Sequence, residues 1–202
     1  PMRYMHLCYT DIPALFVERG FSENVIPYLQ SASNGSYLEY PVLTGAFMFA
    51  ASTLTGLIQG FYPDGFRAFF DVNVMLLFIP FVITVIATAL TSQRLRGQTM
   101  QAAMIVFAPT MILAATINWD LIPIALVSLA LLAWSHERFT LTGVFLGLAI
   151  AAKFYPIVLL IGFVILAWRK RDWKPTRQLI AATVIAFFAA NIPVAVANFE
   201  GW

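Results

Sequence analysis

The chain has few charged residues and a single cysteine. Asp, Glu, Lys and Arg make up only 11% of its 202 residues, against about 25% in an ordinary soluble domain, while 60% are hydrophobic and the mean hydropathy is +0.80. This shortage of charge excludes a soluble domain and indicates an integral membrane protein. Cys8 has no second cysteine with which to form an internal disulfide, and the net charge of +2 is too small to indicate nucleic acid binding.

Motifs that hold metals or nucleotides are missing as well. The two histidines, His6 and His136, are far apart and lack the spacing of a zinc site, and no GxxxxGK[ST] loop is present for ATP phosphates. No cofactor is therefore expected; a divalent metal ion is possible, but no pattern supports it. Because the chain begins at Pro1 in a polar loop without a leader-like segment, we expect a fragment of a larger protein.

What the sequence does contain is a series of apolar segments. We expect membrane spans at residues 72–91, 100–117, 121–134, 139–152, 154–168 and 178–197. The shortest has 14 residues and would be about 21 Å long, against a hydrocarbon core of about 30 Å, so local thinning or a water-filled cavity must accommodate it. The predicted fold is an all-α, polytopic transmembrane bundle of about six spans.

The basic residues suggest an orientation, since cytoplasmic loops carry an excess of Lys and Arg. If residues 169–177 face the cytoplasm, alternation of the spans places Asn118, Asp120 and Lys153 outside, and eight of the 10 acidic residues, Asp120 among them, lie on that side. Eight of the 12 basic residues are then cytoplasmic: Arg94, Arg96, Arg138, Arg169, Lys170, Arg171, Lys174 and Arg177. We predict a multi-pass protein of the cell membrane.

The segment 42–61 decides on which side Asp11 lies. It is apolar but carries Thr, Ser and Gln side chains and three glycines that weaken a helix. We predict an interfacial helix that does not cross, within a first extracytoplasmic loop at 1–71 that precedes the bundle at 72–202. If the segment crosses instead, Asp11 is cytoplasmic. A single span at 139–168 would also place Asp11 outside, but at about 45 Å it is too long, so a break at Lys153 is favoured.

Two carboxylates at the water edge are candidates for chemistry. Asp11 follows Tyr9 and precedes Pro13; it is either a general base for a hydroxyl or a helix cap, and the local sequence favours the cap. Asp120 follows Asn118 and Trp119 in a short connection. There Trp119 is the expected interfacial anchor, whereas Asp120 is either another cap or a second carboxylate in an outer vestibule.

Polar residues beside two other apolar segments are further candidates. Glu39 and Tyr40 precede the segment 42–61. Glu39 is either a further carboxylate of the functional site or an acid that compensates the helix dipole. Lys153, with Tyr155 after it, interrupts an apolar stretch, so its ammonium either snorkels to water or meets an anion such as a lipid phosphate. Upstream, the spacing of Gly143 and Gly147 predicts a close contact between helices.

These elements together resemble the polyprenyl-phosphate-mannose-dependent mannosyltransferases of the GT-C superfamily. The resemblance covers most of the chain, and its specificity lies in the ordered set, because no single motif is distinctive. The elements are Tyr9-Thr10-Asp11, the helix start Glu39-Tyr40-Pro41-Val42-Leu43, Asn118-Trp119-Asp120, and a segment that runs from Gly143 through Gly147-Leu148-Ala149 to Lys153-Phe154-Tyr155-Pro156.

The resemblance implies an inverting transfer of mannose or another sugar from a polyprenyl-phosphate donor to a glycolipid or glycan acceptor. Asp11 is then the catalytic base, and the active site faces the extracytoplasmic side. Substrate contacts are expected from Tyr9, Glu39, Tyr40, Asn118, Asp120, Lys153 and Tyr155. The expected partners are the donor, the acceptor and membrane lipids, and a larger membrane assembly is possible.

Two other classes stay open on the residues alone. A lipid or solute transporter would carry polar residues along a path between its spans, and an inverted repeat would favour it. A non-catalytic subunit of a larger membrane complex would lack a lipid groove beside Asp11.

Overall fold

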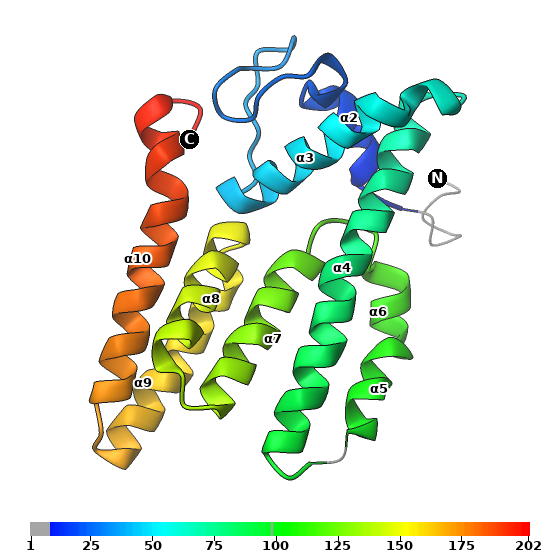
Figure 1. Cartoon of the computed structure of the whole chain (residues 1–202). Helices are drawn as coiled ribbons and strands as arrows, with labels where there is room; N and C mark the ends of the chain where they lie inside the picture. Colours follow the sequence, from blue (N-terminus) through cyan, green and yellow to red (C-terminus); the bar gives the residue numbers. More distant parts are fainter. Residues whose placement is uncertain (1–8, 98) are drawn as a thin grey trace.

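The computed structural model describes residues 9–97 and 99–202, which form a protein built of helices (Figure 1). No strand occurs within these two ranges, so the predicted all-α class is confirmed for them. Cys8 and His6 lie outside the described residues.

A helical bundle forms the long body of the molecule, in which successive helices run up and down (Figure 1). Helix α4 packs on α7, α7 on α8, and α8 on α10, while the broken pair α5 and α6 flanks α4. The bounds are α4 (Gly65–Arg94), α5 (Met100–Val106), α6 (Pro109–Ala114), α7 (Leu121–Ser135), α8 (Phe139–Ala152), α9 (Val158–Lys170) and α10 (Lys174–Ala197).

Helices α8 and α10 approach each other at two glycines. A Cβ atom at Gly143 would lie 2.2 Å from the carbonyl oxygen of Leu179, and one at Gly147 would lie 2.4 Å from that of Thr183. Any larger residue would force the backbones apart, so the predicted small-residue contact is confirmed.

Length and apolarity mark three of the described helical segments as able to cross a membrane: Val42–Phe61, α4 and α10. Helices α7 and α8 are apolar but shorter. These helices support the prediction of a membrane protein, whereas the predicted number of six spans is not established by them.

Two breaks divide the apolar segments. The predicted span at 100–117 consists of two helices, because Pro109 has no N–H to donate and Ala108 before it is extended at ψ 126°. The favoured break at Lys153 is confirmed. Lys153 is extended (φ −160°, ψ 141°) and the short 3-10 helix η3 (Tyr155–Ile157) follows, so a single span at 139–168 is wrong.

Helix α3 (Val42–Ile58), continued by η2 (Gln59–Phe61), lies across one end of the bundle (Figure 1). Near its start, the Thr44 hydroxyl donates to the carbonyl of Ala152 at the end of α8, at 2.7 Å. Further along, the Ser52 hydroxyl donates at 2.8 Å to the carbonyl of Phe21 in η1 (Phe21–Glu23). Both halves of α3 are therefore hydrogen-bonded to other elements at the same end of the molecule.

The first segment of the chain packs against the start of α4. In α2 (Ile12–Glu18), the ring of Phe16 stacks on Phe69 with centroids 4.7 Å apart. Helix α4 itself begins before the predicted boundary at 71/72, because the Asp64 side chain caps it by accepting from the N–H of Arg67 at 2.7 Å. The assignment of 1–71 to an extracytoplasmic loop stays a prediction.

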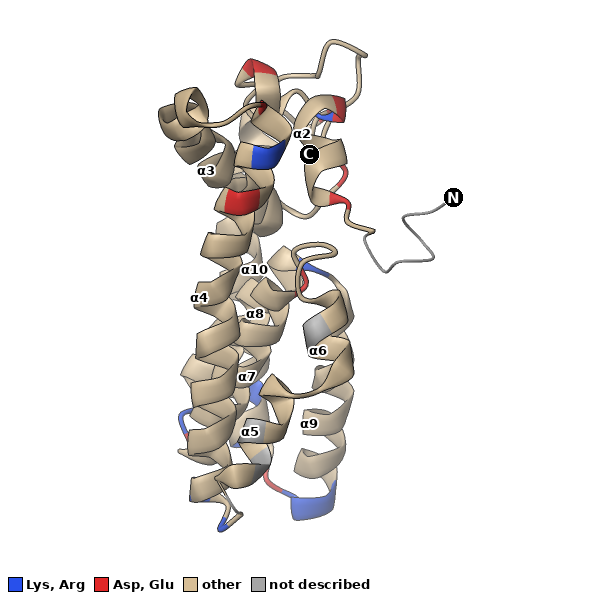
Figure 2. Ribbon diagram, turned by 90° about the vertical axis from the view of Figure 1, so that its right-hand side faces the viewer, with Lys and Arg blue, Asp and Glu red and all other residues tan. Residues whose placement is uncertain are grey.

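Charge is unevenly distributed along the bundle (Figure 2). We call one end the basic end; it carries Arg94, Arg96, Arg138 and residues 169–177. We call the other end the site end; it carries residues 9–41, Asn118 to Asp120, and Lys153. Most Asp and Glu residues lie toward the site end (Figure 2). The separation fits the predicted orientation, and which end faces the cytoplasm stays a prediction.

Candidate functional site

Asp11 stands at the N-cap position of α2, but its side chain does not cap the helix. The carboxylate makes no hydrogen bond to the helix backbone and accepts one from the Tyr9 hydroxyl. The interpretation of Asp11 as a side-chain cap is therefore wrong, although the following Pro13 does fit a helix start. Tyr9 and Asp11, both predicted site residues, are in direct contact.

The backbone around Asp11 is fastened to the segment that precedes the second carboxylate. The N–H of Asp11 donates to the carbonyl of Ile117 at 2.8 Å, and the Thr10 hydroxyl donates to the carbonyl of Thr116 at 2.7 Å. These bonds join two regions far apart in the sequence and bring Asp11 to the turn that carries Asp120. Thr10 was part of a motif in the sequence, but nothing there indicated this role.

Asp120 forms an ion pair with Lys153. Asp120 occupies the N-cap position of α7, yet its side chain makes no cap bond and instead accepts from the Lys153 ammonium. The Asn118 side-chain oxygen accepts the N–H of Asp120 at 2.9 Å and so orders this turn. The side chains of Asp120 and Lys153 are 40% and 34% exposed, which leaves the pair accessible to a ligand.

Tyr40 lies within the field of both carboxylates. Burial, followed by the negative charges of Asp11 and Asp120, raises the pKa of Tyr40 to about 12. Its phenol is therefore protonated at neutral pH and can donate a hydrogen bond. The Tyr28 hydroxyl donates to the Tyr40 carbonyl at 2.8 Å and holds this stretch of backbone.

Tyr155 lies near the same carboxylate pair, in the turn between α8 and α9. Burial raises the pKa of its phenol, and the negative charge of Asp120 adds to this effect. The extended backbone at Lys153 thus turns the chain so that Lys153 and Tyr155 both approach Asp120.

Glu39 is engaged by a residue that the sequence did not single out. Both Glu39 oxygens accept from the Arg19 guanidinium, with the Nε–Oε2 distance at 2.5 Å. This hydrogen bonding is the main reason why the pKa of Glu39 is lowered. Arg19 follows directly after α2, so the ion pair fastens α2 to the residues that lead into α3.

The prediction that Trp119 is an interfacial anchor is wrong. Its side chain is only 1% exposed, and its indole N–H donates at 2.7 Å to the Oδ1 of Asn73, which is fully buried on α4. The Tyr40 ring meets Trp119 edge-on with centroids 5.5 Å apart. Trp119 is therefore a buried residue on which Tyr40 packs. Its position depends on the hydrogen bond to Asn73, a residue that the sequence did not single out.

A cavity of about 220 Å³ adjoins Tyr40, between the start of α3, the end of α8 and α10. Glu39, Tyr40 and Phe154 line one part of it, and Asn191 and Trp202 line another. Its volume is below the range of about 300–1,000 Å³ that is usual for ligand pockets, so it suits one small group of a larger substrate.

The described residues hold no group of three His, Cys, Asp or Glu side chains arranged to bind a metal ion. The expectation that no cofactor is required stays a prediction.

Comparison with known families agrees with this architecture. The profile of glycosyltransferase family 87 matches residues 37–202, which is most of the chain. Of the candidate residues, Asp11 and Tyr9 precede the matched segment, and the others lie within it. No curated protein and no solved structure matches the chain. The chain belongs to glycosyltransferase family 87, whose members are membrane glycosyltransferases of the GT-C type.

Proposed function

We propose that this glycosyltransferase moves a sugar, mannose or a related one, from a polyprenyl-phosphate donor to a hydroxyl of an extracytoplasmic glycolipid or glycan. The observation that carries the proposal is the meeting of Asp11, Tyr40, Asp120 and Lys153 at one end of the bundle. A carboxylate, a protonated phenol and an ammonium group together meet the needs of a transfer from a phosphate leaving group.

Asp11 is the general base of this reaction. Its carboxylate takes the proton of the acceptor hydroxyl, while the acceptor oxygen bonds to the anomeric carbon and the bond from that carbon to the phosphate oxygen breaks. Attack from the face opposite to the phosphate inverts the configuration. The Tyr9 hydroxyl, which donates to Asp11, orients the carboxylate for this role.

Lys153 stabilises the departing polyprenyl phosphate. An ammonium group has three donors, so Lys153 can keep its bond to Asp120 and still donate to a phosphate oxygen. Asp120 then fixes the position of Lys153, and Asn118 holds the Asp120 backbone. A positive charge placed where negative charge develops lowers the barrier to transfer.

The tyrosines and Glu39 contribute to substrate positioning. The phenols of Tyr40 and Tyr155 donate hydrogen bonds to hydroxyls of the sugar or to phosphate oxygens near Asp120. Glu39 borders the cavity beside Tyr40, where its ion pair with Arg19 maintains the shape of the wall.

The test is a transfer assay on the full-length protein with polyprenyl-phosphate mannose and a membrane glycolipid extract. Asp11→Asn removes the base but keeps the size of the side chain, and we expect transfer to fall by about 10²–10⁴-fold. Glu18→Gln is the matched control, because Glu18 is an exposed acid on the same helix and should retain activity. Near wild-type transfer by Asp11→Asn would reject the base. Transfer from a nucleotide sugar, without transfer from polyprenyl-phosphate mannose, would reject the proposed polyprenyl-phosphate donor.

A further inference from the structure

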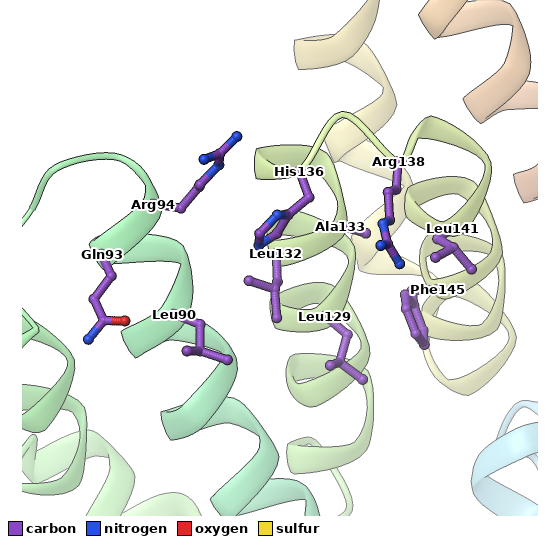
Figure 3. A pocket seen from close by; sticks show the side chains of 10 residues that line it. All are labelled: Leu90, Gln93, Arg94, Leu129, Leu132, Ala133, His136, Arg138, Leu141 and Phe145. Carbon is purple, nitrogen blue, oxygen red and sulfur yellow. The ribbon is translucent and has the colours of Figure 1, made fainter.

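A second and larger cavity lies at the basic end, far from Asp11 and Asp120. It has a volume of about 630 Å³ and is bounded by α4, α7 and α8 (Figure 3). This volume falls within the range of about 300–1,000 Å³ that is typical of sites for small molecules. The sugar-transfer reaction proposed above makes no use of this cavity.

The lining of the cavity divides into a polar mouth with two arginines and an apolar interior. Arg94, His136 and Arg138 lie near the ends of the helices, whereas Leu129 and Phe145 lie deeper along them (Figure 3). No carboxylate is among the described residues that line it. A ligand that fits must therefore carry negative charge at one end and hydrocarbon at the other.

The mouth is built by contacts between its walls. The Nε of Arg94 donates at 3.4 Å to the carbonyl of Ser135, which ties the end of α4 to the turn between α7 and α8. Arg138 occupies the N-cap position of α8, and its side chain extends toward Phe145 in Figure 3. The two arginines thus reach the mouth from different elements, Arg94 from the end of α4 and Arg138 from the start of α8 (Figure 3).

The amino end of α8 adds to the positive potential. The first turn of α8 carries no acidic side chain, and Leu141 of that turn lines the cavity. The backbone N–H groups at the start of a helix carry partial positive charge and favour an anion nearby. Side chains and helix end therefore attract the same kind of group.

We propose that this cavity binds an anionic phospholipid of the membrane, with its phosphate at Arg94 and Arg138 and its acyl chains along the leucines of α4 and α7. A soluble anion would make no contact with the apolar interior, and a neutral lipid would leave the arginines without an opposite charge. Basic pockets between membrane helices are a known way to hold lipid headgroups. The position fits, since the cavity opens at the ends of apolar helices, where headgroups lie.

The test measures lipid binding by the full-length protein, purified in a neutral detergent, by native mass spectrometry. We expect saturable binding of phosphatidylglycerol that exceeds that of phosphatidylcholine with the same acyl chains. Arg138→Gln should weaken phosphatidylglycerol binding about fivefold, and Arg94→Gln combined with Arg138→Gln about 25-fold, since each arginine near a membrane surface contributes about this factor. Leu132→Trp, which fills the interior, should weaken binding of both lipids.

Arg177→Gln is the matched control, because Arg177 is an exposed arginine at the basic end on α10 and does not line the cavity. Its binding should equal that of the wild type. Equal binding of the two lipids, or an equal loss in Arg177→Gln and Arg138→Gln, would overturn the proposal. If inorganic phosphate displaces phosphatidylglycerol at the same concentration as the lipid itself, the cavity is a site for free anions and the proposal is overturned. Thermal unfolding of each variant checks that it is folded. If Leu132→Trp binds phosphatidylglycerol as the wild type does, the lipid does not occupy this cavity and the proposal is overturned.

Discussion

Replacing Lys153 with Met removes the ammonium group that Asp120 holds at the site end while keeping most of the side chain's length. If Lys153 contacts the leaving phosphate, its loss removes one charged donor from the transition state. Such a donor contributes about 10²–10³-fold to the rate. The effect on stability should be much smaller, because Asp120 and Lys153 are 40% and 34% exposed, and ion pairs with this exposure contribute about 1 kcal/mol or less. Activity and stability are therefore expected to separate clearly in this variant.

A double-mutant cycle distinguishes the roles of the two partners. If Asp120 acts only by positioning Lys153, then Asp120→Asn lowers transfer less than Lys153→Met, and the double variant is no slower than Lys153→Met alone. The assay is single-turnover transfer from polyprenyl-phosphate mannose by the full-length protein, with thermal unfolding measured in the same detergent. Losses that multiply in the double variant would show that Asp120 acts independently. Full activity of Lys153→Met would refute the assignment of Lys153 to the leaving group.

Three further predictions concern packing and pH. Gly147→Ala places a methyl group 2.4 Å from the Thr183 carbonyl oxygen and should lower the free energy of unfolding by about 1–3 kcal/mol. Gly162→Ala is the control, because a Cβ there meets nothing within 4 Å, and it should not lower stability. Equal effects of the two variants in thermal unfolding would contradict the close contact of α8 and α10. Trp119→Phe leaves the buried Asn73 oxygen without its donor and should destabilise the protein by about 1–3 kcal/mol, partly recovered in thermal unfolding when Asn73→Leu is added. Because the folded-state pKa of Tyr40 is raised from 10.0 to about 12, its contribution to stability is complete below pH 10 and is lost as the pH rises toward 12. Tyr40→Phe should show less of this loss in unfolding measured across that range, and an unchanged profile would reject the assignment to Tyr40.

The sequence predicted those features of the fold that depend on local chemistry. Apolar segments located the helices, Gly143 and Gly147 marked a close helix contact, and Lys153 before Pro156 marked a break. The apolar pattern located the segment 100–117 but did not predict its division at Pro109 into two helices. There the average apolarity of the window concealed the effect of one residue that has no N–H.

The candidate site was predictable as a set of residues but not as a set of contacts. Asp11 and Asp120 both looked like helix caps, because each does stand at a helix start; only the fold shows that Tyr9 and Lys153 take up their carboxylates. The Trp119 prediction failed for a similar reason, since its indole N–H finds a buried acceptor, Asn73, on a distant helix. No local pattern encodes a partner that comes from elsewhere in the chain.

The bonds from residues 10 and 11 to the carbonyls of Thr116 and Ile117 have a mechanical consequence. Asp120 lies in the same turn as Ile117, and the neighbouring Trp119 is anchored in the core by Asn73. We therefore expect a shift of this turn to carry the backbone of both aspartates with it. A substrate that displaces the backbone at one of these acids is then expected to move the other as well.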